Sequence, residues 1–312
     1  MINRRHIRIK VMQAAYSLLI SGEDNLDKQE VFLVESFTRL HQLYTLQLQL
    51  FVALFDKAVV QFSSSKKNFL QTDSLLVNSP NFAQNKLLLQ LKNSPTLGNY
   101  PLDKTDTKWS DHKEVVMQLW KKVAQSKTFD TYMHLSNPTF EDDKIFVLDL
   151  FKKHIAPNEK LSDFYEAEVI SWVDDIPFVN TWILNNLKKL NAKSIFNPDT
   201  LYKDKQDKYF GLDLFRKTVL NFEKYQKDID KQTPNWDSSR ITKIDQILMT
   251  MAIVEFHDFP SIPTKVTINE YIEIAKDYAT AKSSYFINGV LDKLLESYVN
   301  ENKIEKIGRG LL

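Results

Sequence analysis

Helical spacing is the feature that most constrains the fold of this chain. Apolar residues recur at steps of three and four along most of the 312 residues, which is the period of an amphipathic α-helix. No stretch of the sequence shows the sustained apolar–polar alternation of a half-buried strand. The chain also has only 6 Gly and 10 Pro, too few for a turn-rich β-sandwich. We therefore predict an all-α fold.

The helical patterns are separated by polar or proline-containing stretches. We expect helices near residues 3–20, 27–62, 112–135, 140–155, 161–191, 208–231, 236–257, 265–280 and 283–300. Ser63-Ser64-Ser65-Lys66-Lys67 is predicted to end the second helix, and residues 92–113 are predicted to form a loop. Thr267 and Glu270 have the spacing of a capping box, which predicts a helix start nearby.

Basic residues gather at the N-terminus, although the net charge of +1 by itself predicts no partner. Arg4, Arg5, Arg8 and Lys10 all precede the first acidic residue, Glu23. Such a cluster can be the electrostatic footprint of a nucleic-acid-binding site in a protein that is neutral as a whole. A solvated helix end explains the same cluster equally well.

The first predicted helix has two distinct faces. At about 100° per residue, Arg5, Arg8 and Tyr16 share a stripe that lies apart from the apolar face. An arginine fork can donate two hydrogen bonds to a phosphate, and a tyrosine can stack on an exposed base for roughly 1–3 kcal/mol. This stripe therefore fits single-stranded RNA, whereas spacing alone favours a half-buried Tyr16.

Several chemistries are disfavoured by what the sequence lacks. The absence of Cys excludes disulfides, thiolate metal sites and a catalytic thiol, and it fits a cytoplasmic protein. The six His are scattered without metal-ligand spacing. The sequence contains no nucleophile elbow, P-loop or dinucleotide fingerprint. We predict no enzyme, no catalytic or metal-binding residue and no cofactor.

The N-terminus imitates a signal peptide, since a basic stretch precedes the apolar residues 11–20. Gln13, Tyr16 and Ser17 interrupt that apolar stretch, which favours an amphipathic helix. No segment has about 18 uninterrupted apolar residues, the length of a membrane span. We therefore expect no membrane partner.

Motifs at the two ends of the chain point to one protein family. At the N-terminus stands RRHIRIKVMQAAY, residues 4–16, and towards the C-terminus stand IPTKVTINE, residues 262–270, and FINGVLDK, residues 286–293. Together these motifs resemble the NusB family of transcription antitermination factors. The first resembles the family's arginine-rich first helix, with Ala15 where Leu is common, and the second is similar to the family's Val-Pro-x-Lys-Val-Ala-Ile-Asn-Glu. FINGVLDK is the most specific match, and residues 241–255 resemble the family's central helix.

The resemblance implies a divided chain. We predict a NusB-like two-subdomain helical bundle formed by residues 1–22 and 161–302, interrupted by an inserted helical module over residues 23–160. The tail, residues 303–312, is predicted to be loose.

The resemblance also implies a function. The protein would bind a boxA-like single-stranded element of ribosomal RNA leader transcripts together with the small-subunit ribosomal protein NusE. The complex would help RNA polymerase read through terminators, as part of an antitermination complex. The RNA contacts that we predict are Arg4, Arg5, Arg8, Lys10, Tyr16, Lys282 and Phe286. Asp245 and Glu255, on the central helix, are predicted to contact NusE.

The C-terminal motif carries three further interpretations. The family residue that matches Phe286 stacks on RNA, whereas the position of Phe286 beside Ile287 favours core packing. Ser283-Ser284 is predicted to cap the helix that contains Phe286. Gly289 inside that helix costs about 1 kcal/mol relative to Ala, which predicts the close approach of another backbone.

A second function stays open at this point. The chain can instead be a helical protein-interaction scaffold in ribosome biogenesis, with an insertion that masks or replaces RNA binding. The NusB fold also occurs fused to RNA methyltransferase domains, but no Gly-rich cofactor loop is present in this sequence. The oligomeric state stays open too, because a homodimer can bury the arginine-rich helix.

Overall fold

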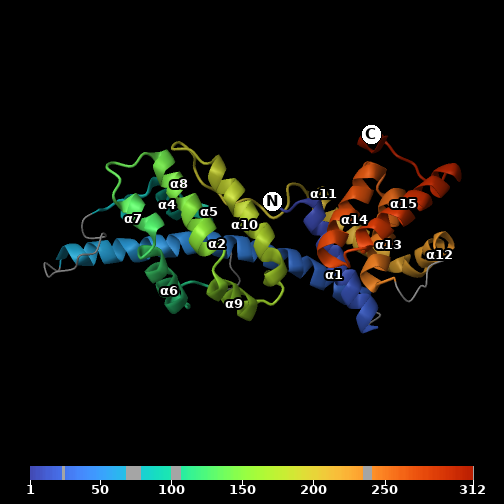
Figure 1. Cartoon of the computed structure of the whole chain (residues 1–312), viewed down its shortest axis with the longest axis horizontal. Helices are drawn as coiled ribbons and strands as arrows, with labels where there is room; N and C mark the ends of the chain where they lie inside the picture. The colour runs from blue at the N-terminus through green and yellow to red at the C-terminus, as the bar shows by residue number, and fades with distance from the viewer. Residues whose placement is uncertain (23–24, 68–78, 100–106, 235–240, 312) are drawn as a thin grey trace. The chain divides into compact units, whose positions relative to one another are not determined.

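The computed structural model describes residues 1–22, 25–67, 79–99, 107–234 and 241–311. Every regular element within these residues is a helix, which confirms the predicted all-α fold (Figure 1). The elements are α1 (Arg4–Ser21), α2 (Leu26–Lys67), η1 (Phe82–Gln84), α4 (Lys86–Lys92), α5 (Pro95–Gly98), α6 (Lys113–Ala124), α7 (Lys127–Met133), α8 (Phe140–Leu150), the π-turn η2 (Phe151–Ile155), α9 (Glu159–Glu168), α10 (Trp172–Lys189), α11 (Lys205–Leu220), α12 (Phe222–Gln232), α13 (Lys243–Asp258), α14 (Thr264–Tyr278), α15 (Ser283–Asn300) and η4 (Gly308–Leu311).

The chain folds into two compact units, one from residues 1–37 with 201–312 and one from residues 38–200. These boundaries differ from the predicted ones, which assigned residues 161–200 to the NusB-like body. In the structure, α10 packs against α8 and α9, and the Trp182 ring stacks on Tyr44 with 4.1 Å between ring centroids. This packing places the segment in the second unit.

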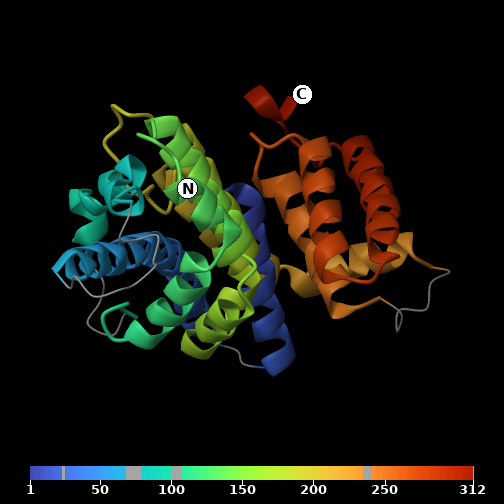
Figure 2. The ribbon, with the colours of Figure 1, turned by 60° about the vertical axis from the view of Figure 1, so that its left-hand side comes forward.

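Helix α13 is the centre of the first unit. It packs against α1, α11, α12, α14 and α15, and every residue from Ile247 to Phe256 is buried. A helix that is apolar on all sides is a core helix surrounded by others. Figure 2 shows α13, α14 and α15 side by side in orange and red.

Helix α1 is held in the first unit by its cap and by close packing. The Asn3 side chain accepts a hydrogen bond from the His6 N–H at 2.8 Å and so caps the helix. Its neighbour α11 carries Gly211, where an added Cβ would lie 3.0 Å from Cγ2 of Ile7 and 3.3 Å from Cζ of Phe37. The glycine therefore permits close approach of the two helices.

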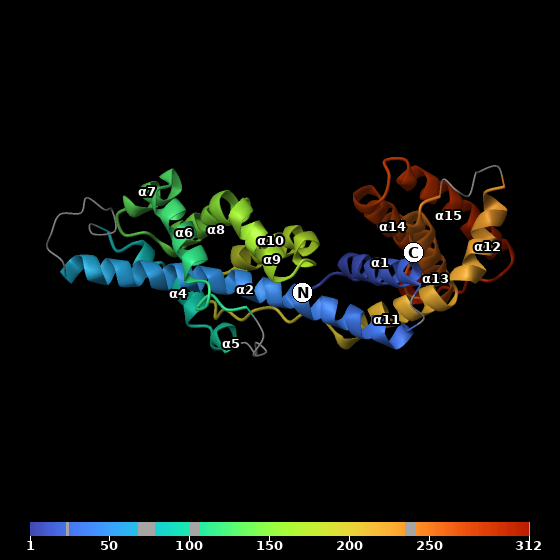
Figure 3. The same cartoon turned by 90° about the horizontal axis from the view of Figure 1, so that it is seen from below.

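An aromatic cluster forms the core of the second unit. The Phe82 ring lies 5.1 Å from that of Trp120 and 5.7 Å from those of Phe129 and Phe146, measured between centroids. Figure 3 shows α2 between α4 and α5 on one side and α6 to α10 on the other. This unit therefore has a hydrophobic core of its own.

Three segments that were predicted as single helices are each two. Residues 112–135 form α6 and α7 because the Ser126 hydroxyl accepts from the Phe129 N–H and donates to the Val123 carbonyl. Residues 161–191 form α9 and α10, and residues 208–231 fall on α11 and α12. Conversely, α2 continues to Lys67 and runs through the serines that were expected to end it.

One segment of α2, Leu26–Ser63, is long and apolar enough to cross a membrane. Its most apolar window is 61% buried within the protein, and Leu40, Leu43 and Leu50 are fully buried. This burial is the behaviour of a core helix, so length and composition are weak evidence for a membrane span here.

The C-terminal tail is ordered against α13, so the prediction of a loose tail is wrong. The Lys306 ammonium donates to the carbonyls of Glu255 and Phe259, both at 3.1 Å. The N–H of Ile307 donates to the Pro260 carbonyl at 3.1 Å. The tail therefore adds donors to carbonyls at the end of α13 and in the loop that follows it.

Candidate nucleic-acid interface

A cleft of about 590 Å³ opens in the first unit, where the first turn of α1 faces the segment before α14 and the tail. We call it the arginine cleft. Its lining residues are Asn3, Arg4, Arg5, Arg8, Ser261, Ile262, Pro263, Val266, Glu270 and Arg309. Four of them are arginines and one is acidic, so the cleft is suited to an anionic ligand.

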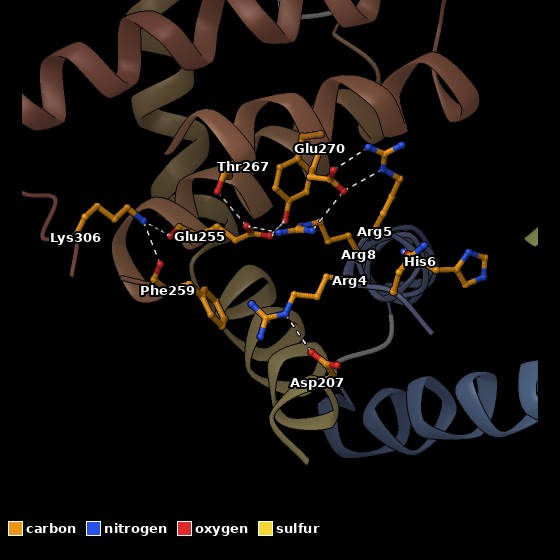
Figure 4. Close-up of polar contacts among 12 residues, drawn as sticks. Arg4, Arg5, His6, Arg8, Asp207, Glu255, Phe259, Thr267, Glu270 and Lys306 are labelled. Atoms are coloured by element: carbon orange, nitrogen blue, oxygen red, sulfur yellow. Dashed lines mark hydrogen bonds and ion pairs between the residues drawn. The ribbon is translucent and has the colours of Figure 1, made fainter. Parts of the chain in front are cut away.

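Arg8 lines the arginine cleft but is buried and paired with an acid (Figure 4). Its side chain is 3% exposed and donates from Nε and Nη2 to the two oxygens of Glu255, at 2.6 and 2.9 Å. Burial opposes its charge, but the charge of Glu255 outweighs this and raises the pKa of Arg8 above its ordinary value. Glu255 also accepts from Thr267 Oγ1 at 3.1 Å and from the Tyr271 hydroxyl at 2.7 Å.

Arg5 is exposed and paired with a different acid. Its guanidinium donates from Nε and Nη2 to Glu270 at 3.0 and 2.8 Å, and its side chain is 44% exposed. Glu270 also lies 3.6 Å from Nη1 of Arg8. The hydrogen bond from Arg5 lowers the pKa of Glu270, aided by the charge of Arg8. Glu270 therefore bridges the two arginines at the cleft.

Arg4 lies at the edge of the cleft beside α11. Its Nε donates to Asp207 at 3.1 Å, and its guanidinium lies 5.1 Å from the centre of the Phe210 ring. The side chain is 40% exposed. A single carboxylate oxygen uses one of its five N–H donors, so the others remain for a ligand.

Sequence reasoning missed Arg309, which the tail brings into the cleft. Arg309 is exposed, and within the described part of the chain it forms no ion pair. Its neighbour Gly310 packs on the loop after α13, because an added Cβ would lie 1.9 Å from the Pro260 carbonyl oxygen. The signal in the sequence was Gly308-Arg309-Gly310, an arginine between two residues that permit close packing.

The other predicted RNA contacts lie outside the arginine cleft. Lys10 is buried, which corrects its assignment, because a buried ammonium in this position does not reach a ligand in solution. Tyr16 and Lys282 are exposed and Phe286 is half-buried. The RNA contacts of these three residues stay predictions.

Asp245 and Glu255 are both buried, and this corrects their assignment to a partner surface. Asp245 is part of a capping box, in which Thr242 and Asp245 each accept from the other's backbone N–H. Glu255 neutralises Arg8 in the interior. Both acids serve the fold because α13 is enclosed on all sides.

The C-terminal motifs carry three smaller predictions. Helix α14 begins at Thr264, which confirms the helix start predicted near Thr267, although Thr267 and Glu270 lie inside the helix and form no capping box. The other two predictions are wrong. The side chains of Ser283 and Ser284 do not cap α15, whose N-cap residue is Lys282. A Cβ on Gly289 would have no neighbour within 4 Å, so no other backbone approaches there.

Among the residues that the structure describes, no group of three or more His, Asp or Glu side chains is placed to hold a metal ion.

The fold and the site together describe an all-helical protein with an arginine-lined cleft suited to an anion. The sequence pattern of the NusB family matches residues 179–296. A relative from Salinibacter ruber is 39% identical over 112 residues, which are 36% of this chain and 70% of the relative. The chain belongs to the NusB family, and it is longer than this relative.

Two further relatives carry the same description, transcription antitermination protein NusB. The one from Chloroherpeton thalassium is 38% identical over 121 residues, covering 39% of this chain and 57% of the relative. The one from Natranaerobius thermophilus is 41% identical over 78 residues, covering 25% of this chain and 56% of the relative. No solved structure matches the chain.

Proposed function

We propose that this protein is a transcription antitermination factor. It acts in the cytoplasm without catalysing a reaction, and it binds a boxA-like single strand in ribosomal RNA leader transcripts. It binds together with the small-subunit ribosomal protein NusE, and the complex promotes read-through by RNA polymerase. Family membership supports the antitermination role, and the arginine cleft is the observation that carries RNA binding.

The residues of the cleft divide into two roles. Arg4, Arg5 and Arg309 present exposed guanidinium groups, which can grip phosphates through two hydrogen bonds each. Arg8 is committed to Glu255 and positions the turn that carries the others. The exposed Tyr16 offers a ring for stacking on a base.

Phosphate binding in the cleft requires displacement of Glu270 from Arg5. An exposed ion pair contributes only about 0–1 kcal/mol, so exchange of this carboxylate for a phosphate is cheap. The buried pair between Arg8 and Glu255 is different, because breaking it leaves an unpaired charge in the interior. We therefore propose that RNA exchanges with Glu270 and leaves Glu255 in place.

The test is fluorescence anisotropy of a labelled boxA-like RNA, with and without NusE, over a series of salt concentrations. The variant is Arg5→Gln/Arg309→Gln, and Lys227→Gln/Lys293→Gln is the control with the same loss of charge in the same unit. We expect the arginine variant to bind at least about tenfold more weakly and to lose about 1.4 from its salt slope, at about 0.7 per phosphate. The control retains the affinity and the slope.

The ion pairs of Arg5 and Arg8 favour a second candidate, the protein-interaction scaffold, because both guanidinium groups already have acidic partners. The same titration separates the two functions. If the wild type binds no RNA even with NusE, or if both double variants bind like the wild type, RNA binding through the cleft is refuted. The scaffold function then stands in its place.

A further inference from the structure

A second basic cleft lies in the second unit, between α6 and the first turn of α9. Its volume is about 690 Å³, and Lys121, Lys122 and Lys160 are among its lining residues. We call it the lysine cleft. It is separate from the arginine cleft, since its residues all belong to the segment 38–200.

The three lysines are not neutralised by the protein. All are exposed, and within the described residues none of them takes part in an ion pair. Glu159 is the one acidic side chain among the described residues that line the cleft. The lining residues therefore carry an excess of positive charge, which favours an anion.

The pKa of a neighbouring histidine is affected by the same lysine charges. His154 lies on η2, and its ring contacts the Thr128 hydroxyl at 3.3 Å. Burial lowers its pKa, and the charges of Lys122 and Lys153 lower it further. Lys153 has its own partner, Asp149, at 2.6 Å, whereas Lys122 forms no ion pair with any acid that the structure describes.

Helix geometry explains two of the lysines and leaves the third unexplained. Lys121 and Lys122 lie in the last turn of α6, where the helix dipole favours cations. Lys160 lies in the first turn of α9, where the dipole disfavours a cation. An anion bound between the two helices would account for a lysine in that position.

We propose that the lysine cleft binds the sugar–phosphate backbone of single-stranded RNA. Lysine binds phosphate as a flexible point charge, without the fixed geometry of arginine. The lining residues include no aromatic ring on which a base could stack. The contact is therefore independent of RNA sequence, and it adds affinity for RNA that extends beyond the element held in the arginine cleft. The identity of the polyanion as RNA rests on the proposed function, while the site itself does not.

The test uses the full chain and oligouridine, an unstructured RNA without a boxA element. The variant is Lys121→Gln/Lys122→Gln/Lys160→Gln. The control is Lys188→Gln/Lys189→Gln/Lys193→Gln, which removes three exposed lysines from the same unit. We expect the cleft variant to bind oligouridine about tenfold more weakly, with the salt slope reduced by about 2 for three phosphates. The control stays within about twofold of the wild type.

Two results overturn the proposal: equal affinities for the two triple variants, or equal competition for the cleft by an oligoglutamate of matched charge. The second result would show a site for acidic protein segments. The preference for a boxA-like RNA over oligouridine is measured in parallel. If the wild type shows no preference for the boxA-like RNA, the proposed function is refuted. The comparison of the two triple variants on oligouridine still tests the lysine cleft in that case. Circular dichroism of each variant confirms that the exposed substitutions leave the helices folded.

Discussion

At the residue scale, Glu255 and Glu270, the two acids that pair with Arg5 and Arg8 of α1, differ in what surrounds them. Glu255 is enclosed and shares its two oxygens among three donor side chains, from Arg8, Thr267 and Tyr271. Glu270 is partly exposed and bridges Arg5 and Arg8 at the mouth of the cleft. The first is part of the fold, and the second is the acid that we propose RNA displaces, so each role can be tested by removing one charge.

Glu255→Gln is expected to destabilise the protein by about 3–5 kcal/mol, because it leaves the buried Arg8 charge uncompensated. Arg5→Gln breaks an exposed pair and is expected to cost less than about 1 kcal/mol. Urea unfolding followed by circular dichroism measures both free energies. Equal losses for the two substitutions would contradict the division between a structural and a displaceable pair.

Glu270→Gln is expected to strengthen RNA binding several-fold, because Arg5 no longer has to release a carboxylate before it binds a phosphate. Glu273→Gln is the matched control, since Glu273 lies one turn further along α14 and is paired with Lys276. Titration of both variants with the boxA-like RNA at fixed salt measures the effect. A Glu270→Gln variant that binds more weakly than the control would refute competition at the cleft.

Sequence reasoning found the three arginines of α1 but neither Arg309 nor the acids that pair with the arginines. Helical spacing placed Arg5 and Arg8 on one stripe, because the period of a helix is a local property. Arg8 is buried against Glu255, however, so the prediction that this stripe lies apart from the core is wrong for Arg8. The acids that bind Arg5 and Arg8 follow 265 and 247 residues later, and spacing cannot tell which face of α1 is enclosed. Lys10 was misassigned for the same reason, since a basic residue on an enclosed helix is buried with it.

At the element scale, the C-terminal tail acts as a strap across the end of α13. Lys306 satisfies carbonyls at the end of the helix, and η4 places Arg309 at the arginine cleft. The tail therefore links the stability of a helix end to the composition of the candidate site.

Gly310→Ala is expected to displace this strap, because the new methyl group would overlap the Pro260 carbonyl. Overpacking of this kind costs about 1–3 kcal/mol, and here release of the tail limits the cost. We expect faster hydrogen exchange at Ile307 and weaker RNA binding, with unchanged exchange in the core of α13. Gly289→Ala, at a helical glycine with open space around it, is the control. Unchanged exchange at Ile307 in the Gly310→Ala variant would contradict the strap.

The positions of helix ends were predicted less well than the helices themselves. The break between α6 and α7 depends on one serine, Ser126, whose hydroxyl bonds to both helices. A helical period continues across such a cap, so periodicity alone joins the two segments. In α2 the reverse holds, since a run of serines that suggests a break is part of the helix.

At the scale of the whole molecule, each unit has its own hydrophobic core. We expect two unfolding transitions, because the buried side chains of each unit contact one another within that unit. Leu248→Ala should lower the free energy of unfolding of the first unit, and Phe146→Ala that of the second, each by about 2–5 kcal/mol. Differential scanning calorimetry and hydrogen exchange of the two variants test this. A single transition that both substitutions shift equally would contradict independent cores.

The division into units could not be predicted from local patterns. The boundary between the units at residue 200 depends on contacts between residues far apart in the sequence, such as the stacking of Trp182 on Tyr44. The resemblance located the motifs and assigned residues 161–200 to the NusB-like body. The family match begins at residue 179, within α10, whereas α10 packs in the second unit.

The order in which the ribosome delivers these segments follows from the division. Residues 38–200 leave the ribosome as one complete unit, whereas the first unit needs α1 and also α11 to α15, which are made last. At about 5–20 residues per second, the apolar face of α1 waits tens of seconds for α13. During synthesis we therefore expect the second unit to fold first, and α1 is the segment that a nascent-chain chaperone would have to shield.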